Sequence, residues 1–196
     1  MQPSRQPFEV TFVKVRRHLR VVLLIAALLW AIELLDVLKP GASLDWYGIQ
    51  PRTLIGLRNI VIAPFLHAGF GHLIANTLPL IALGVLVLVR GPQDFASVSL
   101  VSLLVSGLGV WLFGGSNTVH LGASGVIFGY LGYLLAAGWW ERSPRALLLA
   151  AAVLLVYGSM LPGVLPGREG ISWLAHLFGL LGGILAARLL HNRPSN

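Results

Sequence analysis

The chain has 196 residues, of which 56% are hydrophobic and only 11% are charged, and its mean hydropathy is +0.81. A soluble domain carries roughly 25% charged residues, so the composition excludes an ordinary soluble protein and indicates a single-domain polytopic membrane protein. The absence of cysteine excludes disulfides and a thiolate nucleophile. A net charge of +7 could suggest nucleic acid as a partner. The basic residues lie near the ends of apolar runs, however, so membrane topology explains them better and no nucleic-acid partner is expected.

Six apolar runs are long enough to cross a bilayer, which takes about 20 residues. In chain order, the predicted membrane helices are 21–38, 73–89, 95–113, 121–140, 146–161 and 171–190. The first run follows a basic segment, as in a signal peptide, but no small-residue cleavage site comes after it, so we expect a retained helix. The predicted organisation is a basic cytoplasmic segment (1–20), a six-helix membrane domain (21–191) and a cytoplasmic tail (192–196).

The segment 39–70 is too long for a simple turn between the first two helices. It contains Trp46, Tyr47, Leu54 and Ile55 but no continuous apolar span. Trp and Tyr prefer the membrane–water interface. We therefore expect a long first loop that is partly embedded in the membrane.

The distribution of Lys and Arg predicts the orientation, because cytoplasmic loops carry an excess of both. With the N-terminus inside, ten basic residues lie on the inner side: Arg5, Lys14, Arg16, Arg17, Arg20, Arg90, Arg142, Arg145, Arg188 and Arg193. Four lie on the outer side: Lys39, Arg52, Arg58 and Arg168. Both termini are thus predicted to be cytoplasmic, and the compact chain suits a bacterial inner membrane.

Ser124 is an isolated serine at the start of the fourth apolar run, within His-Leu-Gly-Ala-Ser-Gly. Gly122 and Gly125 leave room for a substrate backbone to approach. A helix N-terminus favours a developing negative charge through its free N–H groups and dipole. Ser124 is therefore a candidate nucleophile. The alternative is that these small residues only form a packing surface between membrane helices.

His176 is equally isolated in the last apolar run, and polar groups inside a membrane are costly and by default functional. Gly179 and Gly183 lie on about the same helix face as His176. The glycines of the fourth run could pack against that face and bring the imidazole to Ser124 as its general base. Helix rise permits the two side chains to share one depth, near the outer surface. The alternative is a structural histidine bonded to a backbone carbonyl.

The second helix begins within His67-Ala-Gly-Phe-Gly-His72-Leu-Ile-Ala-Asn76. His72 and Asn76 are four residues apart, so they project from one face, and both can donate hydrogen bonds to an oxyanion. A metal site at His67 and His72 is disfavoured, because the spacing does not form His-Glu-x-x-His and no acid is nearby. His67 is expected to brace the loop. None of the seven carboxylates lies beside His176 in sequence, so a Ser–His dyad is the simplest interpretation.

Together these three motifs resemble the rhomboid family of intramembrane serine proteases, and the likeness covers nearly the whole chain. Each motif is weak alone, but their order on the second, fourth and sixth helices is specific. The resemblance implies an all-α six-helix membrane bundle with a long membrane-embedded first loop. Two departures are Leu57-Arg58, where the family commonly has Trp-Arg, and Phe128, where it often has Tyr.

The resemblance also implies a serine endopeptidase that uses no cofactor and no metal and cleaves transmembrane proteins near the outer membrane face. Ser124 would attack the scissile carbonyl, with His176 as its base. His72, Asn76 and the Ser124 backbone N–H would hold the oxyanion. Support or substrate contacts would come from the remaining motif residues, Gly122, Ala123, Gly125, Phe128 and His67.

Two other functions are compatible with the composition. A catalytically inactive relative could bind transmembrane clients, although such proteins usually lack the serine or the histidine, and both are present here. A small transporter could use buried polar residues and Pro79, but the polar groups cluster near one face and no paired hydrophobic repeats exist. The glycine-containing segment 162–170 is expected to cover the site and to gate substrate access together with the fifth helix.

Overall fold

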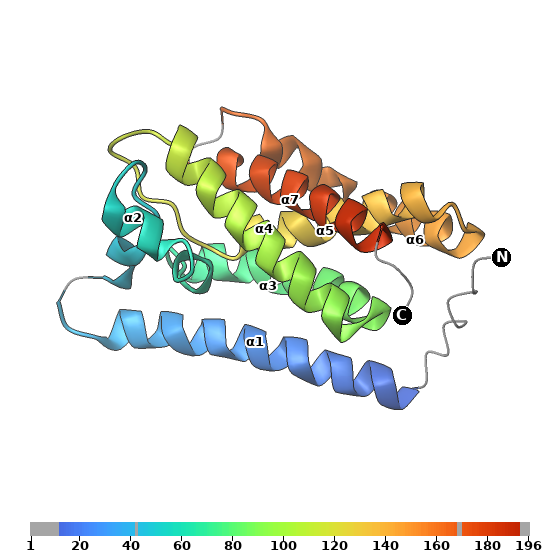
Figure 1. The fold of residues 1–196 in the computed structure, drawn as a ribbon. Coiled ribbons are helices and arrows are strands. Elements are labelled where there is room, and N and C mark those ends of the chain that lie inside the picture. Colours follow the sequence, from blue (N-terminus) through green and yellow to red (C-terminus); the bar gives the residue numbers. More distant parts are fainter. Residues whose placement is uncertain (1–11, 42, 168–169, 193–196) are drawn as a thin grey trace.

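The computed structural model describes residues 12–41, 43–167 and 170–192, and the elements of this part are helices joined by loops (Figure 1). The long helices are α1 (Phe12–Leu38), α3 (Phe70–Arg90), α4 (Pro92–Phe113), α5 (Ser124–Glu141), α6 (Pro144–Tyr157) and α7 (Trp173–His191). A short helix, α2 (Leu54–Asn59), and three 3₁₀ helices, η1 (Leu44–Tyr47), η2 (Ala63–Phe65) and η3 (Gly158–Val164), occupy the loops.

Helix α5 is the centre of the bundle. It packs most extensively against α7 and also contacts α3, α4 and α6. Twelve of its 18 residues are buried, whereas only two residues of α6 are. Helix α1 lies along the edge of the bundle against α3 (Figure 1). The helix that begins at Ser124 is therefore surrounded by four of the other long helices.

Five helices are apolar and long enough to cross a membrane by length and composition: Arg16–Leu38, Phe70–Arg90, Pro92–Phe113, Pro144–Val164 and Trp173–His191. These match five of the six predicted spans. The number of such helices indicates an integral membrane protein. Helix α5 is not one of these five; two thirds of its residues are buried, which suits a helix surrounded by protein rather than lipid. A sixth span remains a prediction.

The observed helix boundaries differ from the predicted ones by three residues or fewer at most ends and by more at two. Helix α1 already includes residues 12–20 of the predicted N-terminal segment, because a basic segment is as able to form helix as the apolar run that follows it. The fifth predicted helix ends at Tyr157, and the chain continues as the 3₁₀ helix η3, which contains Pro162. Residues 1–11 and 193–196 of the predicted terminal segments, and Arg168 and Glu169 of the predicted cover, lie outside the described residues.

Backbone contact between α5 and α7 depends on glycine. A Cβ on Gly179 would lie 2.1 Å from the Gly125 carbonyl oxygen, and one on Gly183 would lie 1.8 Å from that of Gly129. On α5, a Cβ on Gly132 would meet the Leu180 carbonyl oxygen at 2.3 Å. No side chain fits at these points, which confirms the predicted packing of the two small-residue faces.

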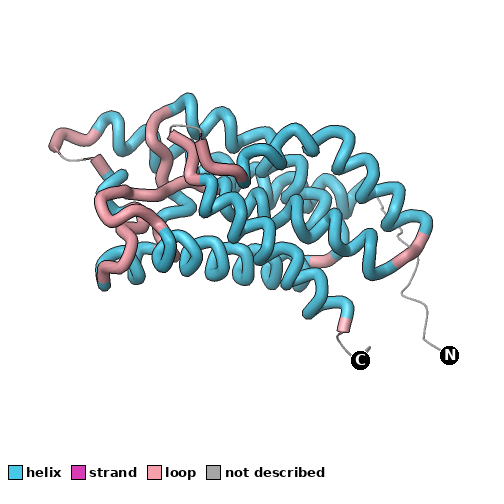
Figure 2. The backbone as a smooth tube through the Cα atoms, turned by 90° about the horizontal axis from the view of Figure 1, so that it is seen from above, coloured by secondary structure: helices cyan, strands magenta, loops and turns pink. Residues whose placement is uncertain are grey.

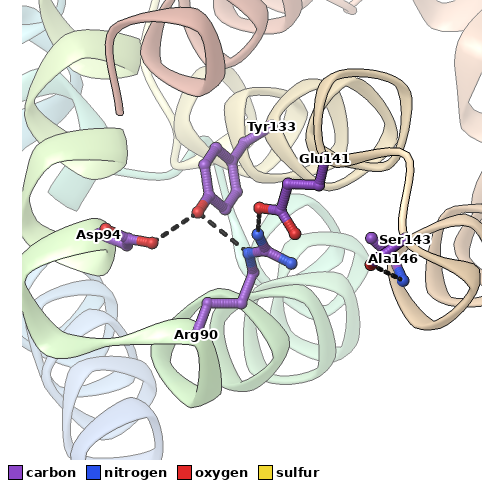
Figure 3. A network of polar contacts seen from close by, with 6 residues as sticks. All are labelled: Arg90, Asp94, Tyr133, Glu141, Ser143 and Ala146. Carbon is purple, nitrogen blue, oxygen red and sulfur yellow. Dashed lines mark hydrogen bonds and ion pairs between the residues drawn. The ribbon is translucent and has the colours of Figure 1, made fainter. Parts of the chain in front are cut away.

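A polar network joins three helices at the end of the bundle away from Ser124 (Figure 3). The Arg90 guanidinium at the end of α3 donates to the Tyr133 hydroxyl at 3.0 Å and forms an ion pair with Glu141. The Tyr133 hydroxyl in turn donates to Asp94 on α4 at 2.8 Å. Because buried charges must be paired, this network fixes α5 against α3 and α4.

The loops lie mostly at one end of the bundle (Figure 2). Ser124 directly follows one of them, because it is the first residue of α5. The first loop runs between Leu38 and Phe70 and contains α2, η1 and η2. It exposes Trp46, Tyr47, Leu54 and Ile55, of which Leu54 is 85% exposed. Such a surface is compatible with contact to lipid, and insertion of the loop in the membrane remains a prediction.

We predict that Gly183→Ala lowers the free energy of unfolding by at least about 1–3 kcal/mol, because the added methyl group would overlap the Gly129 carbonyl. Gly71→Ala is the matched control, since this helical glycine has no neighbouring atom within 4 Å of an added Cβ. The control is expected to be neutral or slightly stabilising. Thermal unfolding in detergent measures both, and equal melting temperatures for the two variants would contradict the assigned packing.

Candidate active site

Ser124 is the first residue of α5 and is 8% exposed. The chain reaches it through Gly122, whose φ of +113° is a conformation that side-chain-bearing residues rarely adopt. Ala123 then occupies the N-cap position and accepts the first helical bonds from Val126 and Ile127, both at 3.0 Å. The sharp turn at Gly122 thus places the serine at a helix N-terminus, where the N–H groups of Ser124 and Gly125 have no partner within the helix.

His176 lies in the first turn of α7. Its Nδ1 is 3.0 Å from the carbonyl oxygen of Gly163 in η3. A carbonyl can only accept, so Nδ1 carries the proton and, in the neutral ring, Nε2 keeps its lone pair. The carbonyl bond that the sequence offered as an alternative role is therefore present, and it leaves the other ring nitrogen available as a base.

Phe128 connects the two helices at this level. Its ring stacks on the His176 imidazole with 4.1 Å between centroids and 9° between planes. Phe128 comes four residues after Ser124, so both project from the same face of α5. Within the described residues, which include both, Ser124 and His176 share no hydrogen bond. Catalytic hydrogen bonds commonly tighten only when substrate is bound.

His72 and Asn76 line the other side of the turn before Ser124. A Cβ on Gly122 would lie 2.8 Å from His72 Nε2 and 3.6 Å from Asn76 Nδ2. Asn76 is 6% exposed, and among the described residues its Nδ2 has no hydrogen-bond partner. A buried amide donor without a partner is costly and calls for an explanation. It is available to a negatively charged oxygen that a ligand would bring.

His67 supports the same turn from the first loop. The Ala123 N–H donates to His67 Nε2 at 3.5 Å, and the ring meets that of His72 edge-on with 5.1 Å between centroids. Burial, with His72 as a further cause, lowers the pKa of His67 from 6.5 to about 4. The ring is therefore neutral at physiological pH and can accept the Ala123 bond. The ring thus contacts the residue that precedes Ser124, and a bracing role for His67 stays a prediction.

The first loop also holds the loop before Ser124 through residues that the sequence did not single out. Arg52 donates to the carbonyl oxygens of Leu112 and Gly114 at 3.2 and 2.7 Å and to Ser116 at 2.7 Å. The Gly122 N–H donates to the Ala63 carbonyl at 2.9 Å. Loop residues carry no periodic pattern, so nothing in the sequence distinguishes Arg52 from an ordinary surface arginine.

The site offers donors and a base but no evident metal centre. Among the described residues, no three His, Cys, Asp or Glu side chains form a group that could hold a metal ion. The partner of the His176 Nδ1 is a backbone carbonyl rather than a carboxylate. The arrangement therefore combines a serine at a helix N-terminus, an imidazole with one free nitrogen, and an unpaired amide donor, which are the parts that acyl transfer needs.

Comparison with known proteins places these features in a family. A family model of the rhomboid domain matches residues 56–193. The protein named "Uncharacterized protein Rv1337" from Mycobacterium tuberculosis is 42% identical over 177 residues, which covers 86% of this chain and 73% of the relative. "RHOMBOID-like protein 4" from Arabidopsis thaliana is 34% identical over 142 residues, covering 66% and 33%. "Putative rhomboid protease YdcA" from Bacillus subtilis is 28% identical over 193 residues, covering 91% of both.

We predict that the protein loses stability as the pH falls from about 6.5 to about 4. The folded pKa of His67 is lowered, so in this window the unfolded chain binds a proton that the folded chain does not. The contribution of neutral His67 to the free energy of unfolding is fully present above pH 6.5. By pH 4 most of it is lost, up to about 3 kcal/mol in all. Burial also lowers the pKa of His120, which acts in the same direction.

Melting temperatures of the detergent-solubilised protein across this pH range test the prediction. His67→Gln keeps a hydrogen-bond acceptor but removes the titration, so its melting temperature should change less with pH. An identical pH dependence in the wild type and in this variant would contradict the assignment to His67.

Proposed function

The chain belongs to the rhomboid family, and on that premise we propose that it is an intramembrane serine endopeptidase with a Ser124–His176 dyad. Proteins of this family act on transmembrane substrates within the bilayer. The observation that carries the proposal is the state of His176. Its Nδ1 is bound to the Gly163 carbonyl, and its ring is stacked on Phe128, which is on the same helix as Ser124. Nε2 therefore remains available as a base for Ser124.

The proposed reaction follows from these groups. Ser124 Oγ attacks the scissile carbonyl carbon while its proton passes to His176 Nε2. His176 then gives that proton to the leaving amine as the C–N bond breaks, which leaves an acyl-enzyme. Water attacks the acyl-enzyme with His176 again as base, and this step releases the new carboxyl end and restores Ser124. Throughout, the Gly163 carbonyl holds the imidazole orientation.

The oxyanion of each tetrahedral intermediate would be held by His72, Asn76 and the Ser124 N–H. Support comes from the unpartnered Asn76 amide and from the position of His72 beside Gly122. Gly122 and Gly125 would support the site rather than the path of the substrate, because an added Cβ would meet the His72 ring at Gly122 and the Ser106 hydroxyl at Gly125.

The proposal extends to topology and substrate. The distribution of basic residues supports six spans with both termini in the cytoplasm of a bacterial inner membrane, and Ser124 near the outer face. Substrates would be transmembrane proteins that reach the site from the bilayer. The sparse burial of α6, together with η3 as its extension toward His176, supports these elements as the gate.

We predict that a fluorescent fluorophosphonate labels the purified wild-type protein and that Ser124→Ala abolishes labelling while the fold is retained. His176→Ala should reduce labelling strongly, because Ser124 then lacks its base. Ser102→Ala is the matched control, since this buried serine lies on α4 and its hydroxyl has no partner among the described residues. That variant should be labelled like the wild type.

Cleavage of a transmembrane substrate in proteoliposomes should show the same order of activities. A folded wild type that is neither labelled nor active on any transmembrane substrate would overturn the proteolytic function. It would favour the alternative of an inactive relative that binds transmembrane clients.

Asn76→Ala is expected to lower kcat by about 10²–10³-fold with little change in KM, because the lost donor acts mainly on the developing oxyanion. Thr77→Val serves as control. Thr77 follows Asn76 on α3, but its hydroxyl donates to Leu73 and accepts from Trp30 of α1, away from Ser124. Similar losses in both variants would indicate damage to α3 rather than to an oxyanion site.

A further inference from the structure

His120 forms a link between the two halves of the candidate site that the dyad does not require. Its main chain pairs with Ile49 of the first loop in both directions, at 2.7 and 3.0 Å. Its Nδ1 is 2.7 Å from the hydroxyl of Ser172, and its Nε2 is 2.8 Å from that of Thr118. The side chain thus extends from the loop that leads to Ser124 to the residue that precedes α7.

Ser172 is the N-cap of the helix that carries His176. Its hydroxyl accepts from the Ala175 N–H at 3.4 Å, and its carbonyl accepts from the His176 N–H at 3.1 Å. His120 lies four residues before Ser124, and Ser172 lies four residues before His176. One side-chain hydrogen bond therefore connects the segments that introduce the proposed nucleophile and its proposed base.

The protons in this network can be assigned from the partners. The Thr118 hydroxyl donates its only proton to the Gly115 carbonyl at 2.7 Å, so it must accept from His120 Nε2–H. A neutral His120 then has a free lone pair at Nδ1, and the Ser172 hydroxyl donates to it. Burial lowers the pKa of His120, in agreement with a neutral ring. Each hydroxyl and each ring nitrogen in the chain from Gly115 to Ala175 then has a defined role.

The first turn of α7 is where such a link has the most effect. The glycine contacts that fix α7 on α5 are at Gly179 and Gly183, beyond His176 toward the other end of the bundle. Preceding His176, the Ser106 hydroxyl of α4 binds the Ala175 carbonyl at 2.9 Å, and Ser172 binds His120. Of these two bonds, only the one to His120 reaches the loop that leads to Ser124.

We propose that His120 is a positioning residue, which sets the separation of Ser124 and His176 by tying the loop before α5 to the N-cap of α7. The inference rests on the proposed proteolytic function. His120 bonds through both ring nitrogens to Ser172 and Thr118 and lines a small cavity together with Gly122 and Ala175. It therefore acts through the backbone of its neighbours and not on the substrate.

The test compares three replacements of His120 by kinetics on a transmembrane substrate. His120→Leu removes both side-chain bonds and should lower kcat by about tenfold or more with little change in KM, because a small misplacement of a base is costly. His120→Asn keeps an acceptor near the Nδ1 position and should recover most of the activity. His120→Gln keeps a donor near the Nε2 position and should recover less.

Two caps provide a matched control. Ser172→Ala removes the His120 link and the N-cap of α7, whereas Ser143→Ala removes the equivalent N-cap of α6, whose hydroxyl accepts from Ala146 at 3.2 Å. Ser143 lies beside the Arg90–Glu141 pair (Figure 3) and follows the last turn of α5, whereas Ser124 begins that helix. Similar losses of melting temperature are expected, but only Ser172→Ala should lower kcat. Ser172→Thr keeps the hydroxyl and should have a kcat close to that of the wild type.

A readout without activity separates this inference from the proposed function. In the Ser124→Ala background, imidazole ¹⁵N signals of His120 should show a protonated Nε2 and an unprotonated Nδ1. His120→Leu in that background should speed amide hydrogen exchange at Ala175 and His176 but not in the last turn of α7. An unchanged exchange rate at Ala175 and His176, or full wild-type kcat in His120→Leu, would overturn the positioning role. An inactive wild type with the expected exchange would overturn the proteolytic function alone.

Discussion

The direct contact of two helix backbones at glycine is the constraint on which the rest of the structure depends. With Gly125 against Gly179 and Gly129 against Gly183, α5 and α7 approach more closely than any side chain allows. In a membrane no hydrophobic force holds helices together, so close van der Waals packing must do so. This packing determines which residues face one another. Phe128 meets the His176 ring, and the segments before each helix come within reach of a single side chain, that of His120.

Polar residues then fix the two ends of the central helix. At one end Arg90, Asp94 and Glu141 surround Tyr133, so charges that would be costly in the bilayer are paired with one another. At the other end the chain before α5 is held by Arg52, His67 and backbone bonds from the first loop. Between its two ends, α5 packs against its neighbours through small and apolar side chains. A serine at its N-terminus is held by neighbours on every side, as precise chemistry requires.

The sequence predicts the fold and the proposed chemical groups better than it predicts their supports. Apolar length is sufficient to find the helices, and the four-residue spacing of glycines is sufficient to pair α5 with α7. Apolar length did not predict that α6 ends at Tyr157 and continues as the 3₁₀ helix η3, which contains Pro162. The roles of Gly163, Arg52 and His120 depend on loops that meet only in three dimensions. His120 in particular appears in sequence as a loop histidine, because Ser172, its partner, is 52 residues away.

For the proposed base His176, a carbonyl partner has a physical advantage over a carboxylate. A carboxylate would orient the imidazole equally well and would stabilise the imidazolium more, but its charge would have to be buried before substrate arrives. The Gly163 carbonyl fixes the same tautomer without adding a net charge. Compared with an imidazole held by a carboxylate, the His176 ring is oriented less by electrostatic attraction and more by packing. This packing consists of the Phe128 stack and the α5–α7 contact. The proposed dyad would need a rigid frame, and for that reason the residues that hold its loops, His67 and His120 among them, would matter as much as the pair itself.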